Sequence, residues 1–266
     1  MTVHDLKRKM KYGIFIPRKV TRTPHVKGSV ISDLFLVRSN QTWKTYFEVL
    51  NIPSLLNGNY SSDQRHNLVF IFFDSEGREI GRKSIQSPQV ARESLLLDSH
   101  FFPQIEEAST FSLFHRDFSC ETDLGDSFVA ERGYTGFQRI DLPIKGYAHG
   151  NLDAVSYFGG SIQMLGNAGF LRRSYQIQHP ATGPANYEFF IVNPSNRKVK
   201  IKFQQRDKSS SWKSFESFVL NPRGSRVVSV SLTLGQIKFI RVVSPLYLGR
   251  PVVFRNTAKS LDVFHG

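Results

Sequence analysis

Short apolar runs that end in turn-forming residues recur along the chain, and they predict strands. Asn67–Phe73 is an apolar run typical of a buried strand, and Asp74–Gly77 after it predicts a hairpin turn. Lys198–Phe203 alternates lysine with apolar residues, which is the period of a strand with one face in water. Helical periodicity is weak, and only Gln89–Leu97 would also fit a short helix. The pattern therefore predicts a mostly β protein.

An internal repeat divides this pattern into two halves. Tyr46–Ser54 aligns with Tyr187–Ser195, where Tyr, Pro and Ser coincide at an offset of 141 residues. Pro88–Arg92 and Pro222–Arg226 both spell Pro-x-x-x-Arg, and each precedes an apolar strand candidate. The same order of strands and turns in both halves indicates two related units.

Two sheets packed face to face are needed to bury so many apolar strands in each half. We therefore expect an all-β fold of two tandem antiparallel β-sandwich domains related by internal duplication. The expected boundaries are a basic N-terminal arm over 1–28, the first sandwich over 29–142, a glycine-rich connection over 143–170 and the second sandwich over 171–266.

Composition supports packed cores and limits the cell compartments to be considered. The chain is 40% apolar and 13% aromatic, which is ample for buried cores. Cys120 is the one cysteine, so an internal disulfide and a cysteine-based metal cage are excluded. No apolar run reaches the roughly 20 residues that span a bilayer, and no signal-peptide pattern follows the basic start. We expect a cytoplasmic protein without a membrane span.

The net charge of +13 is unevenly distributed. Residues 1–28 carry eight Lys or Arg and one acid, residues 29–150 carry 11 bases and 16 acids, and residues 151–266 carry 16 bases and five acids. This asymmetry would steer an anionic partner, or it would hold the halves or two subunits of a homo-oligomer together. The arm could also contact nucleic-acid phosphates, although no nucleic-acid-binding motif accompanies it.

The second half carries a family resemblance between Tyr187 and Phe254. Its segments are Phe190–Ser195, Val199–Phe203, Leu220–Val228 and Pro251–Phe254. Together they resemble the sensory rhodopsin transducer family of small β-sandwich proteins, whose roles are in interactions. The resemblance implies a binding or scaffolding module that self-associates, and it transfers no functional residue.

Two His-Gly pairs are the first candidate site. His149 and His265 follow Phe137 and Phe254 by 12 and 11 residues, so the repeat predicts equivalent places that meet at a seam between the halves. Histidine can shuttle a proton near neutral pH. With Asp153 and Asp262 nearby in sequence, the pair forms a catalytic alternative. Metal-ligand spacing such as His-Glu-x-x-His is absent, so no metal site is expected.

A serine adds a second catalytic hypothesis. Gly125–Phe128, which contains Ser127, and Asp262–His265 resemble the first and last blocks of GDSL-type esterases. The middle block of that family and its alternation of strands with helices are missing. Ser127 is therefore retained only within the catalytic alternative.

Ligand-binding candidates come from glycines, cations and aromatic rings. Glycines in the connection would allow close backbone approach to a ligand, while Trp43 and Trp212 could be platforms for sugar rings. Lys198, Lys200 and Lys202 share one strand face that is either merely solvated or an anion site. The residues assigned to ligand binding are His149, Gly150, Gly159, Gly160, Ser161, Arg172, Arg173 and His265.

These patterns favour one function over another without deciding it. No phosphate-binding or dinucleotide-binding glycine motif is present, so no cofactor is expected. The first hypothesis is a non-enzymatic binding or assembly module for an anionic or carbohydrate-like ligand or a protein partner. The alternative is a hydrolase or sugar-modifying enzyme with a His/Asp site at the domain seam.

Overall fold

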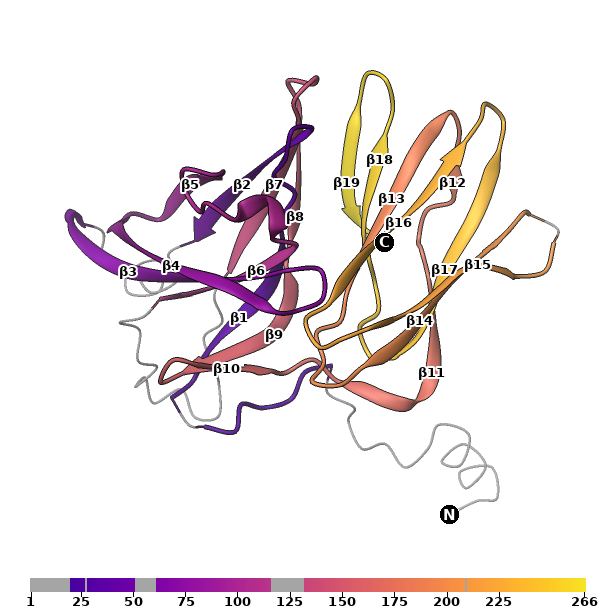
Figure 1. Ribbon diagram of the computed structural model, residues 1–266. Coiled ribbons are helices and arrows are strands. Elements are labelled where there is room, and N and C mark those ends of the chain that lie inside the picture. The colour runs from indigo at the N-terminus through magenta and orange to yellow at the C-terminus, as the bar shows by residue number, and fades with distance from the viewer. Residues whose placement is uncertain (1–19, 27, 51–60, 116–131, 209) are drawn as a thin grey trace, which may run out of the picture.

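The computed structural model describes residues 20–26, 28–50, 61–115, 132–208 and 210–266 (Figure 1). These residues form nineteen strands and one short 3-10 helix, η1 (Ile105–Glu107). The all-β prediction is confirmed, and the segment Gln89–Leu97 is extended rather than helical. Within the described ranges, no helix has the length and apolar character needed to cross a bilayer.

The first half consists of a six-stranded and a four-stranded sheet, both antiparallel. In the larger sheet the order is β10-β9-β1-β6-β3-β4, and in the smaller it is β5-β2-β7-β8. The larger sheet contains β1 (Val30–Leu36), β3 (Ser61–Phe73), β4 (Glu79–Gln89), β6 (Thr110–His115), β9 (Asn151–Phe158) and β10 (Ser161–Met164). The smaller sheet contains β2 (Trp43–Leu50), β5 (Arg92–Leu97), β7 (Arg132–Arg139) and β8 (Lys145–His149).

The second half also consists of two antiparallel sheets. One has the order β11-β17-β14-β15, with β12 paired to β17, and the other has the order β16-β13-β18-β19. The first comprises β11 (Ala168–Gln176), β12 (Ala181–Thr182), β14 (Val199–Arg206), β15 (Lys213–Leu220) and β17 (Ile237–Leu246). The second comprises β13 (Ala185–Val192), β16 (Ser225–Leu232), β18 (Val252–Asn256) and β19 (Leu261–His265).

Both halves share one strand order. The run β1-β6-β3-β4 matches β11-β17-β14-β15, and β5-β2-β7-β8 matches β16-β13-β18-β19. The register agrees as well, because Leu50 pairs with Arg92 while Ile191, 141 positions later, pairs with Arg226. The predicted repeat thus corresponds to equivalent strands, and a gene duplication as its origin stays a prediction.

The segment 143–170 is not a connection between the halves. It contains β8, β9 and β10 and the start of β11, so most of it belongs to the sheets of the first half. The prediction was wrong because the glycines of this segment occupy turns and tight packing sites within strands. Gly159 and Gly160, for example, are the two central residues of the β9–β10 turn, with φ of +54° and +84°.

Each half has its own core. In the first half, Phe35, Phe47, Phe70 and Phe111 pack together between the two sheets, with ring centroids of Phe35 and Phe47 4.7 Å apart. In the second half the core is built around residues such as Phe189, Ile201 and Phe203. Alternating side chains on β14 supply that core, as the period-two pattern at Lys198–Phe203 predicts.

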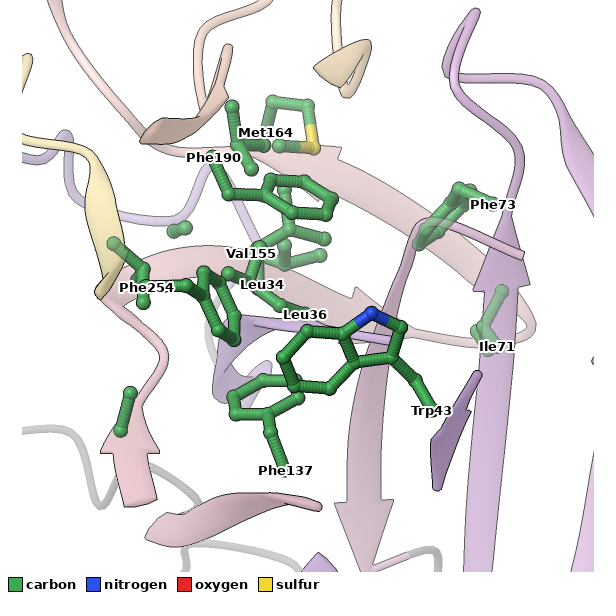
Figure 2. Close-up of a cluster of buried hydrophobic side chains, with 14 of the residues drawn as sticks. Leu34, Leu36, Trp43, Ile71, Phe73, Phe137, Val155, Met164, Phe190 and Phe254 are labelled. Atoms are coloured by element: carbon green, nitrogen blue, oxygen red, sulfur yellow. The ribbon is translucent and has the colours of Figure 1, made fainter. Parts of the chain in front are cut away.

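A third cluster joins the halves (Figure 2). Phe190 and Phe254 from the second half pack with Leu34, Trp43 and Phe137 from the first half. Strand β13 is therefore buried on both faces, because Phe189 and Ile191 face the second core while Phe190 and Val192 face this shared one. Edge strands β8 and β19 lie side by side at the seam (Figure 1). The halves are thus packed as one body.

The β3–β4 turn docks against the second half. Ser225 N donates a hydrogen bond to Ser75 O at 2.9 Å, and Asn221 Nδ2 donates to Glu76 Oε2 at the same distance. Gly77 has φ of +82°, and a Cβ at this position would lie 2.1 Å from the carbonyl oxygen of Pro222. The predicted hairpin turn is confirmed, and it contributes to the interface between the halves.

Gly77→Ala is expected to lower the free energy of unfolding by at least about 2 kcal/mol. A left-handed backbone conformation costs a side chain about 1–3 kcal/mol, and the collision with Pro222 adds to this cost. Urea unfolding of the variant measures the change. Gly159→Ala is the matched control, because its φ is also positive but nothing lies within 4 Å of the added carbon. Equal losses for both variants would contradict the close docking.

Candidate functional site

The two predicted histidines meet at the seam. The ring centroids of His149 and His265 are 4.0 Å apart, and Nε2 of His265 donates to the backbone oxygen of His149 at 3.1 Å. Their positions are not equivalent, however. Glu48 on β2 pairs with Tyr134, which pairs with His149. The counterpart of Glu48 in the second half, Phe189, pairs with Val253, which pairs with Phe264 and not with His265. The contact arises because β8 and β19 are adjacent.

The surroundings of this pair suit a packed joint better than a catalytic centre. Burial, together with the neighbouring His149 and Arg250, lowers the pKa of His265 to about 3, so this imidazole is neutral at pH 7. Asp262 lies 2.7 Å from Arg255 in an ion pair. The side chain of Asp153 and all of Ser127 lie outside the described residues. Within the described part of the chain, no group of three or more metal-ligating side chains gathers.

The remaining predicted ligand residues do not converge on the histidines. Gly159, Gly160 and Ser161 lie at the β9–β10 turn of the first half, whereas Arg172 and Arg173 lie on β11 of the second (Figure 1). Gly150 packs tightly, since a Cβ there would be 2.5 Å from the Cβ of Asp33. The predicted site is therefore three separate places, and its assignment to ligand binding stays a prediction.

The two tryptophans have different environments. Trp43 is buried in the shared core, where Arg38 stacks on its ring at 4.0 Å, so this tryptophan is not a platform for a sugar. Trp212 is half-buried and lies just before β15. Of the two aromatic platforms expected from the sequence, only Trp212 remains a candidate.

A polar and basic surface covers one side of the second sandwich, and we call it the outer face. It is the face of the sheet β11-β17-β14-β15 that points away from the second core. Directly paired residues of antiparallel strands share a face, so strand pairing identifies its members. Those at its centre are Ser174 and Gln176 on β11, Phe239, Arg241 and Val243 on β17, Lys200, Lys202, Gln204 and Arg206 on β14, and Ser214, Ser217 and Val219 on β15.

One row of the outer face crosses four strands, and the side chains of three of its residues form a hydrogen-bonded series. Gln176 pairs with Arg241, Arg241 with Gln204, and Gln204 with Ser214. Arg241 Nε donates to Gln204 Oε1 at 2.8 Å, and Gln204 Nε2 donates to Ser214 Oγ at 3.1 Å. The side chains of this row are held in fixed positions, which reduces the entropy lost when a ligand binds.

Two arginines converge on Trp212 at the end of this row. The guanidinium carbons of Arg206 and Arg241 lie 5.0 and 4.2 Å from the indole centroid, and Arg206 also lies 5.2 Å from the ring of Phe239. Among the described residues, neither guanidinium has a carboxylate partner. The nearby Asp207 pairs with Lys238 at 2.7 Å instead.

This arrangement concentrates positive charge. Burial, and secondly the charge of Arg206, lowers the pKa of Arg241. Arg241 nevertheless stays protonated at neutral pH because guanidinium is a very weak acid. Lys200 and Lys202 extend the charge along β14. An anionic group bound between Arg206 and Arg241 would relieve their mutual repulsion and accept bidentate hydrogen bonds.

The sequence pattern predicts part of this surface. It indicates the lysine row and Trp212 as candidates, but not Arg206 and Arg241. The alternation on β14 continues through Gln204 to Arg206, so Arg206 could have been added to the row. Arg241 could not, because its place beside Gln204 depends on the pairing of β14 with β17, which is remote in sequence.

Comparisons with known proteins leave the family open. No protein-family model and no curated protein matches the sequence. A solved structure, the N-terminal CBM22-1-CBM22-2 tandem domain from Paenibacillus barcinonensis Xyn10C, aligns over 86% of this chain and 80% of that chain. The two chains share 8% identity and a TM-score of 0.17, which is too low to indicate a common fold or function. The resemblance to sensory rhodopsin transducers stays a prediction.

Proposed function

We propose that this protein is a non-enzymatic binding module that recognises an anionic carbohydrate polymer on the outer face of its second sandwich. The observation that carries the proposal is the convergence of Arg206 and Arg241 on Trp212 without a carboxylate partner among the described residues. Two like charges are costly to hold together unless something offsets the repulsion, and a bound anion does so.

The neighbouring groups favour a carbohydrate over other anions. Neutral hydrogen-bonding side chains, such as Gln176, Gln204 and Ser214, alternate with the cations across the outer face. A polymer of hydroxyl-rich units with scattered acidic groups matches this mixture, because amides and hydroxyls both donate and accept hydrogen bonds. A surface for single-stranded nucleic acid would instead present rings along its length on which successive bases stack, whereas the two rings here, Trp212 and Phe239, both lie beside Arg206.

Binding to purified polysaccharides tests the proposal. Isothermal titration with polygalacturonate and heparin should show saturable binding that weakens as salt is added, while uncharged dextran should not bind. Arg241→Gln and Arg206→Gln should each weaken binding by about 10-fold to 100-fold, because a hydrogen bond to a charged group is worth about 1.5–3 kcal/mol.

A matched control separates specific contacts from net charge. Arg226→Gln removes the same charge from an exposed arginine on β16, in the other sheet of the second sandwich, where Arg226 pairs with Glu216 of β15. It should change affinity less than twofold. Equal weakening by Arg226→Gln and Arg241→Gln, or tighter binding of single-stranded DNA than of either polysaccharide, would overturn the proposal.

A further inference from the structure

An apolar protrusion interrupts β11, at the edge of the outer-face sheet. Phe170 is 98% exposed and Leu171 is 73% exposed. Neighbouring strand residues normally point to opposite faces, so that one of the two would be covered. Here the pairing with β17 shifts between Ala168 and Arg173, and the residues between them bulge away from the sheet. We call residues 169–172 the β11 bulge.

The bulge is held in shape by its neighbours. Arg197 Nη2 donates to the backbone oxygen of Ala168 at 2.6 Å and also to that of Gly169. The guanidinium of Arg173 stacks on Tyr247 at 4.0 Å, and Tyr247 N donates to Asn167 O at 3.0 Å. A segment fixed in this way presents Phe170 and Leu171 to solvent as part of the fold.

Positive charge surrounds the apolar tip. Arg172 and Arg173 lie in or directly after the bulge in sequence and Arg197 contacts it, and none of the three has a carboxylate partner among the described residues. Arg22 lies close to the start of β11 as well, because Thr21 bridges to Gly166 and Arg22 N donates to Leu165 O at 2.7 Å.

We infer that the β11 bulge docks the protein onto an anionic lipid bilayer. Phe170 and Leu171 enter the boundary between head groups and acyl chains, where exposed apolar side chains leave water. The surrounding arginines meet the negative head groups, which attract basic segments near a membrane surface. This surface lies apart from the Arg206–Trp212–Arg241 cluster, so the inference does not depend on the proposed function.

Vesicle sedimentation tests the docking. The full chain should sediment with phosphatidylcholine vesicles that contain phosphatidylserine and should remain in the supernatant with phosphatidylcholine alone. The double variant Phe170→Ser/Leu171→Ser should bind at least about 10-fold more weakly, because each large apolar side chain contributes about 1.5–3 kcal/mol when it leaves water. Raising the salt concentration should weaken binding of the wild type.

Leu234→Ser is the matched control. Leu234 is 82% exposed in the turn between β16 and β17, at the opposite end of the second sandwich (Figure 1). Its substitution should leave vesicle binding unchanged. Equal loss in both variants, or equal binding to neutral vesicles, would overturn the inference. So would sedimentation velocity that shows a wild-type dimer and a monomeric double variant, because the bulge would then bind a second copy of the chain.

Discussion

Glu188→Ala is expected to lower the free energy of unfolding by about 3 kcal/mol. Glu188 on β13 accepts two hydrogen bonds of 3.0 Å from Arg38 of the first half, and it also accepts one from Asn256. Arg38 is in turn stacked on Trp43 at 4.0 Å and on Phe254 at 4.6 Å. Removing the carboxylate leaves a guanidinium that is largely buried without its counter-charge, which is costly. Chemical denaturation measures the loss.

Two further variants separate the buried charge from the contact itself. Glu79→Ala breaks the Arg82–Glu79 pair, whose side chains are 36% and 32% exposed, and should cost less than about 1 kcal/mol. Arg38→Met/Glu188→Leu replaces both charges with apolar groups and should restore most of the stability lost in Glu188→Ala. If Glu188→Ala and Glu79→Ala lower the free energy of unfolding equally, the Arg38–Glu188 pair does not join the halves.

Acidification is expected to destabilise the protein through His265. The pKa of this imidazole is lowered to about 3 in the folded chain, whereas an unfolded histidine titrates near 6.5. Stability is therefore complete above about pH 6.5 and is lost as the pH falls toward 3, since the unfolded state binds the proton first. The expected loss between about pH 7 and about pH 4 is roughly 2–3 kcal/mol from this group alone.

His265→Gln isolates that contribution. Glutamine keeps a donor for the backbone oxygen of His149 but does not titrate, so its stability should fall less steeply with acid than that of the wild type. His100→Gln, at an exposed position of the first half, should reproduce the wild-type profile. Parallel profiles of the wild type and His265→Gln would show that the seam does not exclude the charged imidazole.

The fold was predictable wherever the information was local. The apolar run Asn67–Phe73, the turn Asp74–Gly77 and the alternation at Lys198–Phe203 each determine a strand or turn through side-chain periodicity. The offset between Tyr46 and Tyr187 identified equivalent strands, β2 and β13. The segment 143–170 was misassigned, because Gly146 and Gly150 permit close packing within the sheets and do not mark a linker.

The candidate site was less predictable because it depends on long-range pairing. The repeat predicts that His149 and His265 meet at equivalent places. They do meet, but their places are one residue out of equivalence, and the contact comes from the adjacency of β8 and β19. The sequence does not indicate that Trp43 is buried and Trp212 is only half-buried, because the burial of Trp43 depends on how the two halves pack. The approach of Arg241 to Arg206 requires β14 to lie beside β17.

The fluorescence of Trp212 tests most directly whether the outer face binds an anionic carbohydrate. The chain has two tryptophans, and Trp43 is buried in the core that joins the halves. Titration of the wild type with polygalacturonate should change the tryptophan emission saturably. The same titration should leave the emission of Trp212→Phe unchanged, and titration of the wild type with dextran should also leave its emission unchanged. Saturable binding with unchanged Trp212 emission, or a response that persists in Trp212→Phe, would contradict the account.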